Sequence, residues 1–102
     1  MARLVVIYKA AKDPVAFDKY YFGTHVPIAK KIPGLRKYVV SQGVVGTPAG
    51  PSGSPLVAIL HFDNMAAIQN AFASAEGQAT VANLKNFTTE PPEILMFDSR
   101  EI

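Results

Sequence analysis

Two histidines are the main candidates for acid–base chemistry in this chain of 102 residues. His25 follows a tyrosine pair, Tyr20 and Tyr21, and His61 comes near the end of an apolar run. Imidazole can give or take a proton near neutral pH because its ordinary pKa is about 6.5. The chain has no cysteine, which excludes disulfides, thiolate nucleophiles and cysteine-ligated metals.

His25 shares one face of a predicted helix with four other side chains. The five residues are spaced four, four, three and four apart: Phe17, Tyr21, His25, Ile28 and Ile32. Periodicity alone favours a core histidine bonded to a carbonyl or a tyrosine hydroxyl. The functional alternative is a general acid or base in a pocket between helix and sheet, where apolar surroundings would shift its pKa.

His61 and Tyr38 are placed on predicted strands. The simplest interpretation of His61 is an end-of-strand histidine, and contact with a substrate is the alternative. For Tyr38 the simplest interpretation is a packed ring whose hydroxyl reaches water, and orientation of a substrate is the alternative. No carboxylate stands at ligand spacing around either histidine, so we expect no metal site.

The elements that position these residues follow a recognisable order. Apolar and β-branched runs predict strands over 3–9, 35–45, 55–62 and 93–98. Helices are predicted from Asp13 to Ile32 and from 63 onward, with an interruption at Glu76–Gly77 and a further piece over 78–86. That piece should turn Ala79 and Ala82 inward, with Val81 as a further candidate. This order predicts one α+β domain over 1–102, a ferredoxin-like βαββαβ sandwich. Its four-stranded antiparallel sheet should carry both helices on one face.

Two segments should be irregular. Pro27 cannot donate a hydrogen bond to the Gly23 carbonyl, so we expect a kink or break at Gly23–Thr24, with Thr24 capping a fresh turn. Residues 46–54 are rich in Gly, Pro and Ser, which predicts a hairpin loop, and a lid over a nearby pocket is the alternative.

The predicted strands are apolar on both faces. In 3–9, for example, Leu4 and Val6 alternate with Val5 and Ile7. If the helices cover one face, the other would be a large exposed apolar patch, which monomers rarely tolerate. We therefore expect two sheets to meet face to face in a homodimer.

Composition excludes several other classes. A net charge of +2, without a long basic run or a recognisable module, argues against nucleic-acid binding. The apolar run near the N-terminus is too short for a signal-peptide core or a membrane span, so we expect a cytoplasmic protein that uses no membrane.

Two stretches resemble the small single-domain members of the EthD family, named after ethyl tert-butyl ether degradation. The first is YYFGTHVPIAKKIPGLR, with an aromatic pair, H-x-P and P-G-L. The second is SAEGQATVANLKNFTTEPPEILMF, with S-x-E-G-Q and N-L-x-N-F. Many members have a tryptophan in the aromatic pair, where this chain has Tyr20 and Tyr21.

The resemblance implies a dimeric α/β barrel related to muconolactone isomerases, polyketide cyclases and cofactor-independent monooxygenases. The implied function is a cofactor-independent oxidoreductase or isomerase that acts on a small apolar carbonyl or phenolic compound in a catabolic pathway. His25 would shuttle a proton and Tyr38 would orient the substrate, against a wall of Phe17, Tyr21, Ile28 and His61. The alternatives are a non-catalytic small-molecule-binding accessory protein of such a pathway, or an assembly module with a filled core.

Overall fold

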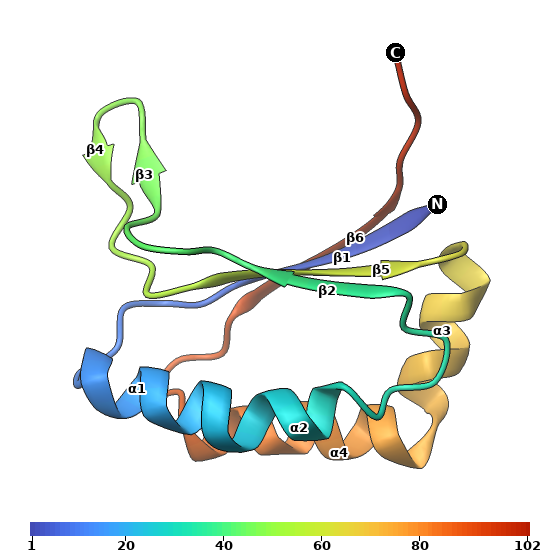
Figure 1. The fold of residues 1–102 in the computed structure, drawn as a ribbon, viewed down its shortest axis with the longest axis horizontal. Coiled ribbons are helices and arrows are strands. Elements are labelled where there is room, and N and C mark those ends of the chain that lie inside the picture. Colours follow the sequence, from blue (N-terminus) through green and yellow to red (C-terminus); the bar gives the residue numbers. More distant parts are fainter.

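The computed structural model describes residues 1–102 and contains two layers, a sheet and a set of helices on one of its faces (Figure 1). The antiparallel sheet has the order β2-β5-β1-β6, formed by β1 (Ala2–Ile7), β2 (Lys37–Val40), β5 (Val57–Phe62) and β6 (Glu93–Asp98). The helices are α1 (Pro14–Tyr20), α2 (Val26–Ala29), α3 (Met65–Ala73) and α4 (Ala75–Asn83). The chain thus adopts the predicted ferredoxin-like α+β fold.

The first helix begins as predicted and then widens. The Asp13 side chain accepts a hydrogen bond from the Ala16 N–H at 3.1 Å, and Pro14 occupies the first turn. From Tyr21 to His25 the chain is a π-helix, in which the Val26 N–H donates to the Tyr21 carbonyl. The predicted irregularity is present, but Thr24 caps nothing, because no side chain caps α2 and the backbone continues without a break.

The π-helical segment changes which side chains face the sheet. A π turn accommodates one residue more than an α turn, so the residues that follow it are rotated around the helix axis. Ala29 and Ile32 are buried, whereas Ile28 is only half-buried. The prediction that Ile28 shares the inward face with His25 is therefore wrong, because Ala29 takes that position instead.

The second helical region is divided at Ser74, not at Glu76–Gly77 as predicted. Ser74 has an extended backbone, ends α3, and caps α4 by accepting the Gly77 N–H at 3.0 Å. Gly77 is buried against the end of α3, where an added Cβ would collide with the Ala71 carbonyl oxygen.

The inward face of α4 also differs from the prediction. Gly77 and Thr80 are its buried residues, and Ala79 and Ala82 are exposed. Helix α4 begins early, after Ser74, and Gly77 packs closely against α3. These two features fix the rotation of α4 about its axis, and the positions of apolar residues alone did not predict that rotation.

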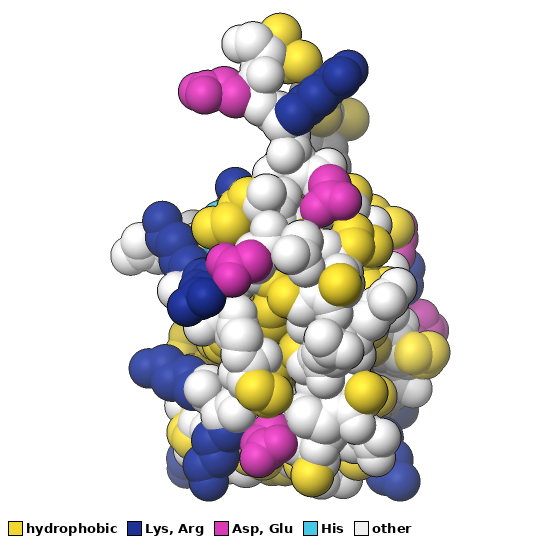
Figure 2. Space-filling model, turned by 90° about the vertical axis from the view of Figure 1, so that its right-hand side faces the viewer, with side chains coloured by type: hydrophobic (Ala, Val, Ile, Leu, Met, Phe, Trp, Pro, Cys, Tyr) yellow, Lys and Arg dark blue, Asp and Glu magenta, His cyan; other side chains and the backbone are white.

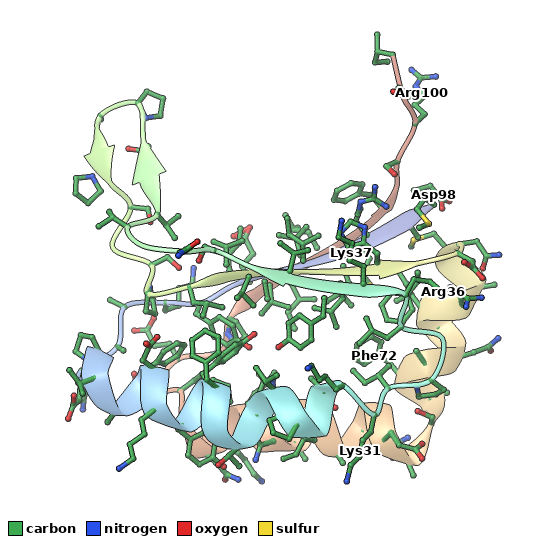
Figure 3. The ribbon with its side chains drawn as sticks, in the orientation of Figure 1. Lys31, Arg36, Lys37, Phe72, Asp98 and Arg100 are labelled. Atoms are coloured by element: carbon green, nitrogen blue, oxygen red, sulfur yellow. The ribbon has the colours of Figure 1, made fainter.

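The sheet has one covered face and one open face. Lys37 points to the open side in Figure 3, whereas Phe72 of α3 extends into the layer between sheet and helices. The open face is largely apolar and includes Val5, Ile7, Val39, Ile59 and Leu95, which alternate with the covered residues along the strands. Strand β6 forms one edge of the sheet, and its residues Ile94 to Phe97 are 42–52% exposed.

Residues 46–54 contain a small hairpin of β3 (Gly46–Thr47) and β4 (Gly50–Pro51). It stands on the open side of the sheet, as does the C-terminal segment, which projects clear of the body (Figures 1 and 2). The hairpin is thus on the opposite side of the sheet from the helices, where it cannot act as a lid over the space between the two layers. None of the helices has the length and apolar character that crossing a bilayer requires.

Candidate functional site

A cavity of about 300 Å³ lies between the sheet and the helices. Fourteen of its seventeen lining residues are hydrophobic when the tyrosines are counted. β1, β2, β5 and β6 line one side, and the π-helical segment, α2, α3 and α4 line the other. Its volume is at the lower end of the range for ligand pockets, so it suits a small apolar molecule. Only three polar lining residues are not tyrosines: His25, Gln69 and Thr80.

His25 reaches this cavity from the end of the π-helical segment. Its side chain is 3% exposed and lies between two rings, with centroid distances of 5.4 Å to Tyr21 and 4.8 Å to Phe87. Its Nδ1 is 2.9 Å from the Oδ1 of Asn83. Burial lowers the His25 pKa below its ordinary value, while the hydrogen bond to Asn83 acts in the opposite direction. His25 is therefore neutral at pH 7.

The other ring nitrogen of His25 is free to act. Nε2 has no hydrogen-bond partner in the chain. Nε2 also keeps some solvent-accessible surface. Only one side-chain nitrogen or oxygen, Nη1 of Arg3, has neither contact with solvent nor a hydrogen-bond partner. His25 lines the cavity, so a molecule bound there is in contact with its side chain.

Three tyrosines line the same cavity: Tyr8 from the end of β1, Tyr21 from the π-helical segment and Tyr38 from β2. The hydroxyls of Tyr21 and Tyr38 are 2.5 Å apart. Burial raises the pKa of all three phenols, most strongly that of Tyr21, so each keeps its proton. Because one of the two protons of Tyr21 and Tyr38 lies between their hydroxyls, this pair keeps one proton that can be donated to a developing oxyanion.

Three of the predicted site residues, Phe17, Ile28 and His61, lie outside the cavity. Phe17 is behind it, where its ring stacks on Tyr21 with centroids 5.9 Å apart and an interplanar angle of 11°. Ile28 is displaced by the rotation of α2. Of the predicted set, the structure brings together His25, Tyr21 and Tyr38.

His61 belongs to the open face of the sheet. It is paired with Arg3 on β1 and Lys37 on β2, and strand alternation puts all three side chains on one side. Burial and these two cations lower the pKa of His61. His25 and His61 are thus on opposite sides of the sheet, and no group of three or more His, Asp or Glu side chains comes together.

The chain matches the family model of the EthD domain over residues 9–91. It is also 32% identical to an EthD family protein from Bacillus halodurans, whose crystal structure superposes with a TM-score of 0.89 and covers 98% of this chain and 99% of that one. The chain belongs to the EthD family.

Two other similarities extend this result. An uncharacterized 11.0 kDa protein of the thcB–thcC intergenic region of Rhodococcus erythropolis is 30% identical over 102 residues, which is all of this chain and 98% of that protein. The second is SnoaB from Streptomyces nogalater, a cofactor-independent oxygenase whose crystal structure is that of a mutant form. It has the same fold at a TM-score of 0.67 and 18% identity, covering 99% of this chain and 94% of SnoaB.

Tyr8 and Asn83 are two residues at this EthD protein's site that were not predicted as site residues. Tyr8 was assigned only to the first strand, although it is an outlier there as a polar aromatic at the end of an aliphatic run. Asn83 was included only in the N-L-x-N-F stretch, and its side chain is the partner of His25. Sequence spacing held no signal for that pairing, because the two residues are 58 positions apart.

Proposed function

We propose that this EthD protein is a cofactor-independent enzyme that moves a proton on a small apolar carbonyl or phenolic compound in a cytoplasmic catabolic pathway. One observation carries the proposal: a neutral imidazole and two tyrosines whose hydroxyls are bonded to each other line the same apolar cavity. This combination supplies a base and an oxyanion donor in largely apolar surroundings.

In the proposed reaction, His25 Nε2 removes a proton from a carbon next to a carbonyl group, and the C–H electrons pass to the carbonyl oxygen. The enolate oxygen that forms accepts a hydrogen bond from the Tyr38 hydroxyl, whose oxygen in turn accepts one from the buried Tyr21 hydroxyl. Low dielectric strengthens those bonds, and preorganised donors need no rearrangement as the charge develops.

Two outcomes follow from the same first step. In an isomerase, the imidazolium returns the proton to a different atom of the substrate. In a monooxygenase, dioxygen oxidises the carbanion at a methylene carbon, so that one oxygen atom becomes the new carbonyl oxygen and the other leaves as water. The similarity of fold to a cofactor-independent oxygenase supports the second outcome.

A proton-exchange assay tests the shared step. Incubation of 2-indanone in D₂O with the protein should speed deuterium incorporation next to the carbonyl. His25→Ala should reduce the enzyme-dependent rate by about 10²–10⁴-fold, the usual contribution of a general base. Tyr38→Phe should reduce it by about 10²-fold, because one oxyanion donor is lost.

His61→Ala is the matched control, since His61 is the other histidine and faces away from the cavity. An equal loss in His61→Ala and His25→Ala would contradict the assignment. Binding of 2-naphthol that survives His25→Ala, together with no exchange by the wild type, would favour a non-catalytic binding protein instead.

We further propose that the open sheet face is covered by a second copy of the chain, giving a homodimer. The apolar side chains of this face are only half-buried in the single chain. Isologous packing would remove them from water and turn two open sheets into one closed structure.

A further inference from the structure

Asn83 links His25 to the end of α4 and to Tyr20. The Asn83 Oδ1 is 2.9 Å from Nδ1 of His25, and its Nδ2 donates to the Tyr20 hydroxyl, also at 2.9 Å. The amide therefore spans two side chains of the first helical region from a different helix. Neither Asn83 nor Tyr20 lines the cavity, so both act from behind the imidazole.

The two ends of the amide have different hydrogen-bonding capacity. An amide oxygen only accepts and an amide NH₂ only donates. With Nδ2 donating to Tyr20, the Oδ1 is turned to Nδ1 of His25, and that nitrogen must supply the proton. A neutral imidazole has one N–H, so Nε2 then carries a lone pair directed away from Asn83.

We propose that Asn83 is a positioning residue that holds neutral His25 in the Nδ1–H tautomer, leaving Nε2 as the basic nitrogen that faces the cavity. This inference rests on the proposed function of His25 as a base. Asn83 itself touches no substrate, and its NH₂ group is bonded to the Tyr20 hydroxyl.

A merely structural role for Asn83 would have a different signature. A hydrogen bond that only tied α4 to the first helix could be made with either tautomer. Tautomer state is thus the property that separates the two roles, and it can be measured without substrate.

The first test is an NMR experiment on wild-type protein labelled with ¹⁵N in its histidine rings, at pH 7.5. Long-range ¹H–¹⁵N correlations distinguish a protonated ring nitrogen from a bare one, and His25→Ala assigns the signals. We expect Nδ1 protonated and Nε2 bare. A proton on Nε2 overturns the proposal, whatever the activity of the protein.

The second test compares variants. Asn83→Leu should lose the Nδ1–H signature and lower kcat for 2-indanone exchange at least about tenfold, as expected for removal of an orienting partner. Asn83→Asp should restore the signature and much of the rate, since a carboxylate accepts the same N–H. Its charge should also move the acid limb of the pH profile upward.

Asn86→Leu is the matched control, because Asn86 is three residues further on, is exposed and makes no hydrogen bond with His25. An equal loss of rate in Asn86→Leu and Asn83→Leu would overturn the proposal. The two proposals fail separately. If NMR shows the Nδ1–H tautomer but His25→Ala leaves the deuterium-exchange rate unchanged, the proposed role of His25 as a base is refuted. If His25→Ala abolishes deuterium exchange but NMR shows the proton on Nε2, the proposed role of Asn83 is refuted.

Discussion

Ala58→Leu tests whether the cavity is open space in solution or a core that closes on itself. Ala58 is 1% exposed, is the second residue of β5, lies opposite Val6 and Val40, and lines the cavity. The substitution adds three carbon atoms to a side chain that points into a volume of about 300 Å³.

The expected gain follows from the area removed from water. Burial of each added carbon contributes about 0.8 kcal/mol, so three of them in empty space stabilise the fold by up to about 2.4 kcal/mol. In filled space the same side chain would cost about 1–3 kcal/mol through strain.

Ala71→Leu provides the matched control. Ala71 is also 1% exposed but lies outside the cavity, in α3, where it packs closely against Gly77. We expect the control to lose about 1–3 kcal/mol.

Urea unfolding of the two variants and the wild type measures the difference, because a change in midpoint at constant slope reports stability. Fluorescence titration with 2-naphthol should show binding weakened at least about tenfold by Ala58→Leu, since the added side chain occupies the ligand volume. If Ala58→Leu destabilises the protein as much as Ala71→Leu does, the cavity is filled or collapsed in solution. That result would favour an assembly module with a filled core over an enzyme.

Three further predictions concern other parts of the molecule. Because burial lowers the pKa of His25, the unfolded chain binds protons more readily, and the urea midpoint should fall as the pH drops below about 6.5. His25→Gln should flatten that dependence, and an unchanged slope would contradict the shift. Gly77→Ala should lower the free energy of unfolding by about 1–3 kcal/mol in the same assay, since the Cβ has no room beside α3, and a neutral effect would show that α3 and α4 can separate. Ile59→Glu, in the middle of the open face, should convert the proposed dimer to a monomer in sedimentation velocity. Phe22→Glu, exposed on the helical side, should not, and a wild-type monomer would refute the dimer.

Strand and helix order could be predicted because the signals were local. Asp13 and Pro14 indicated where α1 begins, and the predicted range of the last strand, 93–98, matches β6. Pro27 indicated that the first helix is irregular. The form of the irregularity was not predictable, since both a break and an added residue relieve the missing N–H.

The site was less predictable because it depends on rotation and long-range contact. Local spacing placed His25 and Tyr21 on the inward face, and that part is confirmed by their burial. Spacing also placed Ile28 there, because a regular α-helix was assumed. Asn83 was missed because α4 starts three residues earlier than predicted, at Ala75, and its rotation is set by the packing of Gly77.

The π-helical segment has a consequence for comparing EthD proteins. From Phe17 to Ile32 the inward residues are spaced four, four, four and three. Without one residue between Tyr21 and His25, the spacing would become four, three, four and three, which is the pattern of an uninterrupted α-helix. The segment is thus equivalent to a single inserted residue. A relative with a straight helix would keep the histidine in the same place in space, one position earlier in its sequence. An alignment without a gap at this point would therefore match His25 to the wrong residue.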